Sequence, residues 1–185
     1  LTQWWGMPRA EGFWGTAMIA GNGRLFTMRA NRPDRQPAEQ VFLTARSLTS
    51  GIVLWQQRLR QAPETEKVSH GGYLPGRSCL AVSGDVLYRI DRDGVLRLNA
   101  ETGAELGRVA GPQPGGQVKW MACAGEWLAV LAGETDVIQP IECQTVAANP
   151  WGRELAVYEA GSGRELWHET AGGAVDERFV AIRED

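Results

Sequence analysis

A repeated pattern runs through the chain, and it is clearest in Gly94-Val95-Leu96-Arg97-Leu98-Asn99-Ala100-Glu101-Thr102-Gly103-Ala104-Glu105-Leu106. Leu96, Leu98 and Ala100 alternate with the residues between them, and a period of two is that of a β-strand. A tight turn is expected at Glu101-Thr102-Gly103, because glycine supplies the positive φ that such a turn often needs. The stretch therefore predicts a strand, a turn and a second strand.

The same strand–turn–strand pattern occurs twice more, at 43–55 and at 155–167. A hairpin is predicted upstream of the first copy, because Asn22-Gly23 lies between two apolar runs, which is a strong hairpin signal. Two further segments, 79–88 and 121–130, copy this hairpin. Each unit therefore offers four strands, with a connection of variable length between its hairpin and its strand–turn–strand pattern.

The connections vary in length while the strand pairs stay constant. The hairpin glycines lie at 23, 84 and 125 and the turn glycines at 51, 103 and 163, so the two glycines of a unit are 28, 19 and 38 residues apart. Repeats that grow by loop insertion behave in this way, and units of about 40–50 residues are the size of propeller blades. The additional length lies in two polar loops that contain proline, 30–40 and 133–153.

Four strands in each unit predict an all-β chain, namely a β-propeller of four-stranded antiparallel blades. The expected blades span about 16–60, 77–110 and 118–170, within a single propeller domain over 1–185. The segments 1–15 and 171–185 are expected to be parts of flanking blades, since 178–182 has the pattern of the first strand of a further unit.

The composition argues against a nucleic-acid partner and against a membrane span. The chain of 185 residues has 19 basic and 22 acidic side chains and a net charge of −3. A nucleic-acid-binding surface typically shows a basic stripe, whereas the arginines here are scattered. No apolar run approaches the about 20 residues needed to cross a bilayer.

The three cysteines, Cys79, Cys123 and Cys143, form no C-x-x-C motif, so neither a zinc ribbon nor a c-type haem site is indicated. They are interpreted as buried small apolar residues, with one disulfide and a remaining thiol as the alternative.

The turn motif carries a family resemblance. A strand followed by a small residue and Thr/Ser-Gly-x-x-Leu-Trp is similar to the repeat of pyrroloquinoline-quinone-type β-propellers, and the segments 49–55, 101–106 and 161–167 match it. In that family the tryptophan docks between adjacent blades, and carried over this role falls on Trp55 and Trp167. The second unit departs from the pattern with Gly107, so its contact is expected to be weaker or filled by another side chain.

The resemblance implies structural roles for the turn glycines Gly51, Gly103 and Gly163 as well. It also implies a location in the bacterial periplasm or cell envelope. Family members include quinoprotein dehydrogenases, a scaffold lipoprotein of outer-membrane barrel assembly and many proteins without an assigned role. The segments 3–6 and 21–26 resemble large planctomycete-type propeller proteins of unknown function.

Propellers of this family usually have eight blades, and even the smallest closed ring needs about four. Three and a half units do not close such a ring. We therefore expect either a part of a larger ring of seven or eight blades, or chains that complete one another, because an open array exposes apolar blade faces.

Three residues are candidates for ligand binding: His70, Arg77 and Trp120. His70 lies in a loop between units, and such loops cluster at the mouth of a propeller. Family dehydrogenases hold their quinone with a vicinal cysteine pair, a stacking tryptophan, an arginine and calcium ligands. No two cysteines are adjacent here, so no cofactor is expected from this chain alone, with pyrroloquinoline quinone and calcium as the alternative.

The sequence thus predicts a binding or scaffold module that presents loops and blade edges to a protein partner or a small ligand, or that self-associates. The alternative is a part of a quinoprotein-type dehydrogenase whose cofactor ligands lie mostly outside this chain. No catalytic residue and no metal ligand is assigned.

Overall fold

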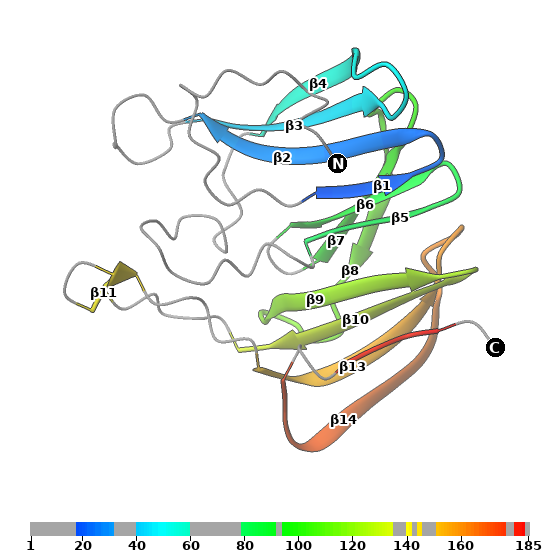
Figure 1. Ribbon diagram of the computed structural model, residues 1–185. Helices are drawn as coiled ribbons and strands as arrows, with labels where there is room; N and C mark the ends of the chain where they lie inside the picture. Colours follow the sequence, from blue (N-terminus) through cyan, green and yellow to red (C-terminus); the bar gives the residue numbers. More distant parts are fainter. Residues whose placement is uncertain are drawn as a thin grey trace.

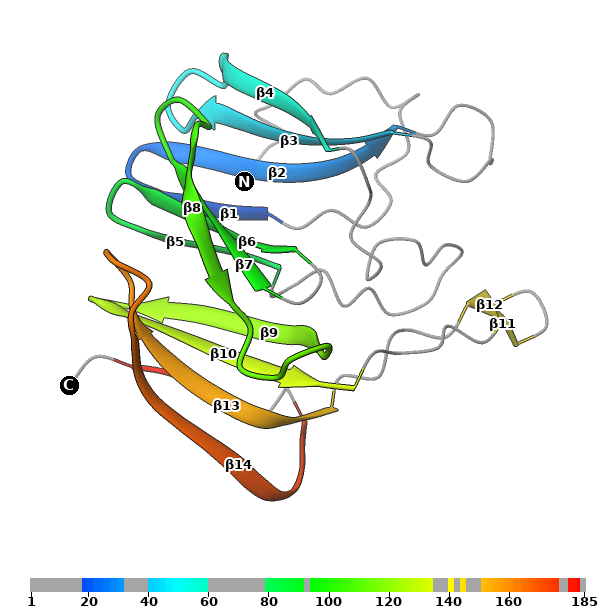
Figure 2. The same ribbon diagram turned by 180° about the vertical axis from the view of Figure 1, so that it is seen from behind.

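Three antiparallel sheets of four strands each lie one beside the next in a computed structural model of the chain (Figures 1 and 2). The structure describes residues 18–31, 40–59, 79–91, 94–134, 140–141, 144–145, 151–176 and 180–183. These residues form strands, turns and short connections and contain no helix, and none of them belongs to a helix that could cross a membrane. The prediction of an all-β chain built from four-stranded blades is confirmed.

Each sheet is a simple meander whose strands follow one another from the inner to the outer edge. The first sheet contains β1 (Met18–Gly21), β2 (Arg24–Asn31), β3 (Gln40–Ser47) and β4 (Val53–Leu59). The second contains β5 (Leu80–Ser83), β6 (Val86–Asp91), β7 (Gly94–Asn99) and β8 (Glu105–Ala110). The third contains β9 (Gln117–Ala124), β10 (Trp127–Gly133), β13 (Trp151–Glu159) and β14 (Glu165–Asp176).

The longest connection of the third sheet carries a small hairpin of its own. It lies between β10 and β13 and consists of β11 (Pro140–Ile141) and β12 (Gln144–Thr145). It falls within the loop expected at 133–153. The inserted length therefore leaves the pairing of β10 with β13 intact.

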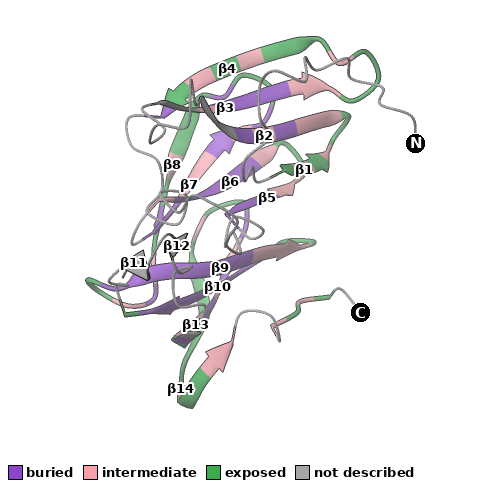
Figure 3. Cartoon of the chain, turned by 60° about the vertical axis from the view of Figure 1, so that its left-hand side comes forward, coloured by how far each residue is buried: buried purple, intermediate pink, exposed green. Residues whose placement is uncertain are grey.

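The sheets meet along their faces, with the inner strand β5 in contact with both β1 and β9. Strands buried on both faces read as continuous apolar runs, and β10 is buried from Leu128 to Gly133. Buried residues concentrate on the inner and middle strands, and exposed ones on the outer strands β4, β8 and β14 (Figure 3). The core is thus a stack of interfaces between sheets, and its largest fully buried side chains are Tyr88, Phe26, Met28, Leu43, Leu87, Leu128 and Leu131.

The turn before the outer strand has the same geometry in all three sheets. Its glycine, Gly51, Gly103 or Gly163, has a φ of 74°, 76° or 79°. The residue three positions before each glycine donates its backbone N–H across the sheet, in the pairs Leu48 to Gly23, Ala100 to Asp85 and Ala160 to Glu126. These three turns are therefore equivalent positions of one repeat.

Candidate functional site

The strand registers align one row of side chains in each sheet. The rows are Phe26–Ala45–Trp55 in the first sheet, Tyr88–Arg97–Gly107 in the second and Ala129–Val157–Trp167 in the third. In the first and second sheets this row lies on the side that contacts the next sheet in sequence order, and the third row lies on the equivalent side of its sheet. We call this side the forward face of each sheet.

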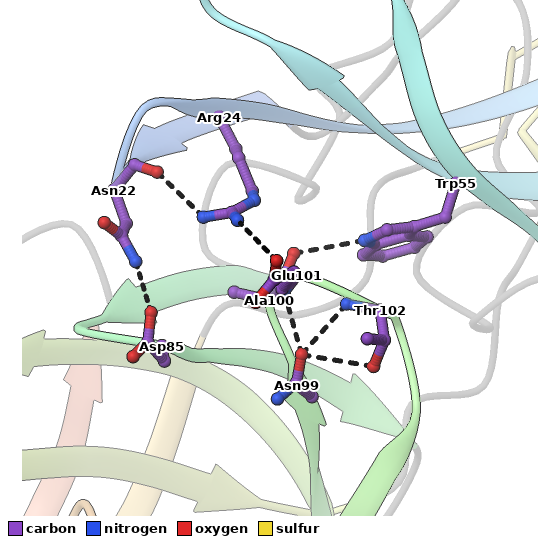
Figure 4. Close-up of polar contacts among 8 residues, drawn as sticks. All are labelled: Asn22, Arg24, Trp55, Asp85, Asn99, Ala100, Glu101 and Thr102. Carbon is purple, nitrogen blue, oxygen red and sulfur yellow. Dashed lines mark hydrogen bonds and ion pairs between the residues drawn. The ribbon is translucent and has the colours of Figure 1, made fainter.

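Trp55 joins the first sheet to the turn of the second (Figure 4). Its indole Nε1 donates a hydrogen bond of 3.1 Å to the carbonyl oxygen of Ala100, and Gln57 Nε2 donates one of 2.6 Å to the carbonyl oxygen of Gly103. A Cβ added to Gly103 would lie 3.0 Å from the Trp55 ring. The glycine thus lets the indole rest directly on the turn, while the Phe26 ring lies tilted against the indole with centroids 6.0 Å apart.

Polar contacts surround the indole where the first sheet meets the second (Figure 4). We call this contact region between two sheets a joint. Asn22 donates from Nδ2 to a carboxylate oxygen of Asp85, and Arg24 lies 4.0 Å from the Glu101 carboxylate. The side-chain oxygen of Asn99 accepts hydrogen bonds from the backbone N–H groups of Glu101 and Thr102, each at 2.9 Å. Asparagine therefore fixes the turn in the shape that receives Trp55.

A different set of side chains forms the joint between the second and third sheets. Tyr88 donates its hydroxyl to the carbonyl oxygen of Ala160 at 2.7 Å, and Ala160 is the equivalent of Ala100. Arg97 donates from Nη1 to the Ser162 carbonyl at 2.9 Å and from Nη2 to the Gly161 carbonyl. Gly107 stands where the other two units have a tryptophan, and an arginine and a tyrosine from the neighbouring strands make the contact in its place.

Burial at this second joint shifts the acidity of its hydroxyl and thiol groups. It raises the pKa of Tyr88 to about 12 and that of Tyr158 to about 12. Tyr158 donates to the carbonyl oxygen of Ala110 at 3.0 Å, so the third sheet also binds back to the second. Cys123 lies close to Tyr88, and burial raises the pKa of its thiol to about 12, which keeps it protonated and unreactive.

A hollow of about 300 Å³ opens beside this second joint. Its lining includes Tyr88, Glu126, Glu159 and Ser162. The Ser162 hydroxyl donates to Glu159, and this bond together with Arg164 holds the pKa of the Glu159 carboxyl below its usual value. Glu159 and Ser162 are therefore engaged in hydrogen bonds within the turn that the second sheet contacts.

The forward face of the third sheet has no described sheet in front of it. Trp120, Ala129 and Leu131 form a buried cluster there, and Val180 and Ile182 from the C-terminal segment pack on it. Trp167 and Trp127, on the same face, remain 43% and 46% exposed. Among the residues that the structure describes, the Trp167 indole has no hydrogen-bond acceptor, unlike the indole of Trp55.

Of the three described outer strands, β14 has the longest run of exposed residues. Every residue from Glu165 to Thr170 is exposed, and β14 pairs on one side only, with β13. A cross-strand cluster stabilises this pairing: the Glu154 carboxylate accepts hydrogen bonds from His168 Nε2 at 2.9 Å and from the Thr170 hydroxyl at 2.8 Å. Both bonds hold the pKa of the Glu154 carboxyl below its usual value.

The predicted ligand-binding residues are not brought together by the described structure. Trp120 lies on β9 in the apolar cluster of the forward face, where it packs against Leu131 and its neighbours. His70 and Arg77 lie outside the described residues, as do Cys143 and segment 3–6. Across the described ranges, no group of three His, Cys, Asp or Glu side chains could hold a metal ion.

Sequence reasoning missed the roles of Tyr88 and Arg97. Neither residue belongs to a sequence motif, and the strand registers show that Arg97 pairs with Gly107 and Tyr88 with Arg97. The motif alone does not identify these residues. Alignment of the three units by strand register shows that they lie beside Gly107, where the other units have a tryptophan.

No protein-family model and no curated protein matches the sequence. Among solved structures, a europium-containing methanol dehydrogenase matches with a TM-score of 0.51 and 16% identity, over 85% of this chain and 24% of that one. The quinohemoprotein alcohol dehydrogenase from Comamonas testosteroni matches with a TM-score of 0.51 and 14% identity, over 83% and 20%. BamB from Moraxella catarrhalis matches with a TM-score of 0.41 and 13% identity, over 84% and 50%.

The chain therefore spans about a quarter or less of the length of the two dehydrogenases. At such low identity the likeness concerns the fold alone. Together with the three equivalent sheets, it shows that the chain has a β-propeller fold built from four-stranded blades.

Proposed function

We propose that this chain is a protein-binding scaffold module of the quinoprotein-like propeller type, and that the edge of β14 is its binding surface. The observation that carries the proposal is the run of six exposed residues from Glu165 to Thr170, on a strand that pairs on one side only. An open edge presents unpaired backbone N–H and C=O groups, which a strand of another protein can bind.

The side chains of this edge suit an extended peptide. Leu166 and Trp167 are 44% and 43% exposed and offer apolar contacts, while Glu165 and Glu169 flank them with negative charge. A strand added to β14 would alternate its side chains between the two faces of the sheet. The edge therefore favours a partner strand that carries apolar and basic side chains.

The family resemblance supports a periplasmic or cell-envelope location, where a scaffold would meet envelope proteins. A part of a quinoprotein-type dehydrogenase, with pyrroloquinoline quinone and calcium, is the alternative. Fold likeness is all that supports this alternative, so the binding module is the function that we put to the test.

The test uses a phage-displayed library of randomised peptides of strand length, selected on the immobilised chain. Hydrogen–deuterium exchange then maps each selected peptide on the protein. We expect slower exchange at the backbone amides of 165–170 when a peptide is bound. Protection at another site, or selection of no peptide that protects β14, would overturn the proposal.

A matched pair of variants separates the β14 edge from the other outer strands. Leu166 lies at the bulge of β14, and Leu106 lies at the equivalent bulge of β8 with a similar exposure of 47%. Lysine on an edge strand opposes pairing with a further strand. Leu166→Lys is expected to weaken peptide binding at least about tenfold, and Leu106→Lys to leave it unchanged.

A further inference from the structure

A joint like that of Trp55 needs a docking tryptophan on one sheet and a receiving turn on the next. The third sheet carries such a tryptophan, and the first sheet carries such a turn. Trp167 is the register equivalent of Trp55, and it stands 43% exposed on the forward face of the third sheet. The turn from Leu48 to Gly51 is the equivalent of the Ala100–Gly103 turn, and Leu48 is 42% exposed. Within the described ranges, the chain therefore holds a docking tryptophan without its turn and a receiving turn without its tryptophan.

From this complementarity we infer that two copies of this chain associate head to tail, with Trp167 of each copy docked on the Leu48–Gly51 turn of the other. Trp167 also belongs to the β14 surface proposed for peptide binding, but the association between copies is tested without any peptide. It rests on the geometry of the joint already formed within the chain, between Trp55 and Gly103.

The backbone of the receiving turn has the shape that the joint requires. Gly51 has a φ of 74°, against 76° for Gly103, so both turns present the same glycine in the left-handed region. Leu48 donates its backbone N–H to Gly23 as Ala100 does to Asp85, and Gly51 donates its N–H to Ser47 as Gly103 does to Asn99, so the two turns have equivalent backbone hydrogen bonds. The expected acceptor for the Trp167 indole is therefore the carbonyl oxygen of Leu48.

The C-terminal segment limits the contact to the outer part of the face. Val180 and Ile182 pack on the cluster that contains Trp120 and Leu131, on β9 and β10. Trp167 on β14 lies beyond this cover and stays exposed. The proposed contact therefore involves only the outer strand of one copy and the Leu48–Gly51 turn of the other, as the joint at Trp55 involves an outer strand and a turn.

The described residues of two copies together contain six four-stranded sheets. Propellers commonly have about 4–8 blades, so this number is compatible with a closed ring. A twofold arrangement satisfies both head-to-tail contacts at once, and closure prevents further growth into a filament.

The test measures the solution mass of the whole chain by light scattering. We expect 20.2 kDa at low concentration and twice that mass at high concentration, over a range from about 1 to about 100 µM. A mass that stays at 20.2 kDa across this range overturns the inference, whatever the variants do.

Two variants each remove one half of the joint. Trp167→Ala removes the indole, and Gly51→Asn adds a side chain where the ring must rest, with a residue that tolerates a positive φ. Each variant alone is expected to dimerise at least about tenfold more weakly than the wild type. Leu106→Ala, an exposed change on the second sheet, is the control that should leave dimerisation unchanged.

Mixing the two variants gives the most specific result. A Trp167→Ala chain keeps its turn and a Gly51→Asn chain keeps its indole, so an equimolar mixture can form one intact joint. We expect the mixture to dimerise more tightly than either variant alone. A dimer that Trp167→Ala leaves unchanged, or a mixture no tighter than its components, would show that the copies associate through another surface.

Discussion

The indole Nε1 of Trp55 lies 3.1 Å from the carbonyl oxygen of Ala100, and the hydroxyl of Tyr88 lies 2.7 Å from that of Ala160, the equivalent carbonyl one sheet further. Equivalent backbone carbonyls thus accept a hydrogen bond from a tryptophan in one joint and from a tyrosine in the other. The donors even come from different strands, since Trp55 is on β4 and Tyr88 on β6. The repeat conserves the receiving turn and lets the docking side chain vary.

The first prediction separates ring packing from hydrogen bonding at Trp55. Trp55→Ala removes a half-buried ring and should lower the free energy of unfolding by about 2–4 kcal/mol. Trp55→Phe keeps an aromatic ring and loses the bond to Ala100, so its cost should be about 1 kcal/mol. Urea unfolding followed by circular dichroism measures both variants. Equal losses for Ala and Phe would contradict the packing role.

The second prediction compares two glycines in the left-handed region. Gly103, at φ +76°, would bring a Cβ within 2.8 Å of Gln57 and 3.0 Å of the Trp55 ring, whereas Gly84, at φ +52°, has nothing within 4 Å. Gly84→Ala should cost about 1–2 kcal/mol from backbone strain alone. Gly103→Ala should cost about 1–3 kcal/mol more, because the joint must open to admit the methyl group.

Thermal and urea unfolding of the two variants provide the measurement. The difference between their free energies of unfolding is the informative quantity, because both variants carry the cost of alanine at a positive φ. If Gly84→Ala destabilised the chain as much as Gly103→Ala does, the close approach of Trp55 to the turn would have no energetic consequence.

The strand pattern was predictable because it depends on local chemistry. In the second unit, the hairpin expected at 79–88 and the strand–turn–strand pattern expected at 94–106 are observed as the strands Leu80–Ser83, Val86–Asp91, Gly94–Asn99 and Glu105–Ala110. Alternating side chains and glycine turns fix such strands without help from distant residues. The outer strand of the third sheet was the exception, since β14 continues past Thr170 to Asp176.

The joints were only partly predictable, because they form between residues far apart in the sequence. Trp55 could be singled out from its motif, but its acceptor Ala100 lies 45 residues away. Arg97 and Tyr88 have no motif of their own, and both appear in the sequence as ordinary strand residues. Their part in the joint depends on the stacking of two sheets, which no local pattern encodes.

The third prediction concerns stability at high pH. Tyr88 and Tyr158 have pKa values of about 12 in the folded chain, against 10.0 for a free tyrosine. The unfolded chain therefore loses these protons first, and the stabilisation present below pH 10.0 declines as the pH rises toward about 12. The double variant Tyr88→Phe/Tyr158→Phe should show a shallower decline over this interval.

Urea unfolding at a series of pH values tests this dependence. Cys123 also has a raised pKa of about 12 and contributes to the same decline, so both chains are compared in a Cys123→Ala background. The double variant should also be less stable at neutral pH by about 1–3 kcal/mol, because the carbonyls of Ala160 and Ala110 lose their donors. Identical slopes in the two chains would show that the tyrosines stay accessible to solvent.

The fourth prediction concerns stability at low pH. Hydrogen bonds from His168 and Thr170 lower the pKa of Glu154 below its ordinary value of 4.5. The resulting stabilisation is present above the pKa of the unfolded carboxyl and disappears as the pH falls through the folded one. Glu154→Gln keeps an acceptor between the strands and removes the titration, so stability should fall less steeply below pH 4.5 than in the wild type. Glu105→Gln, an exposed change on β8, is the matched control and should leave the acid slope of the wild type unchanged, whereas an equal flattening in both variants would assign the effect to net charge and not to the Glu154 cluster.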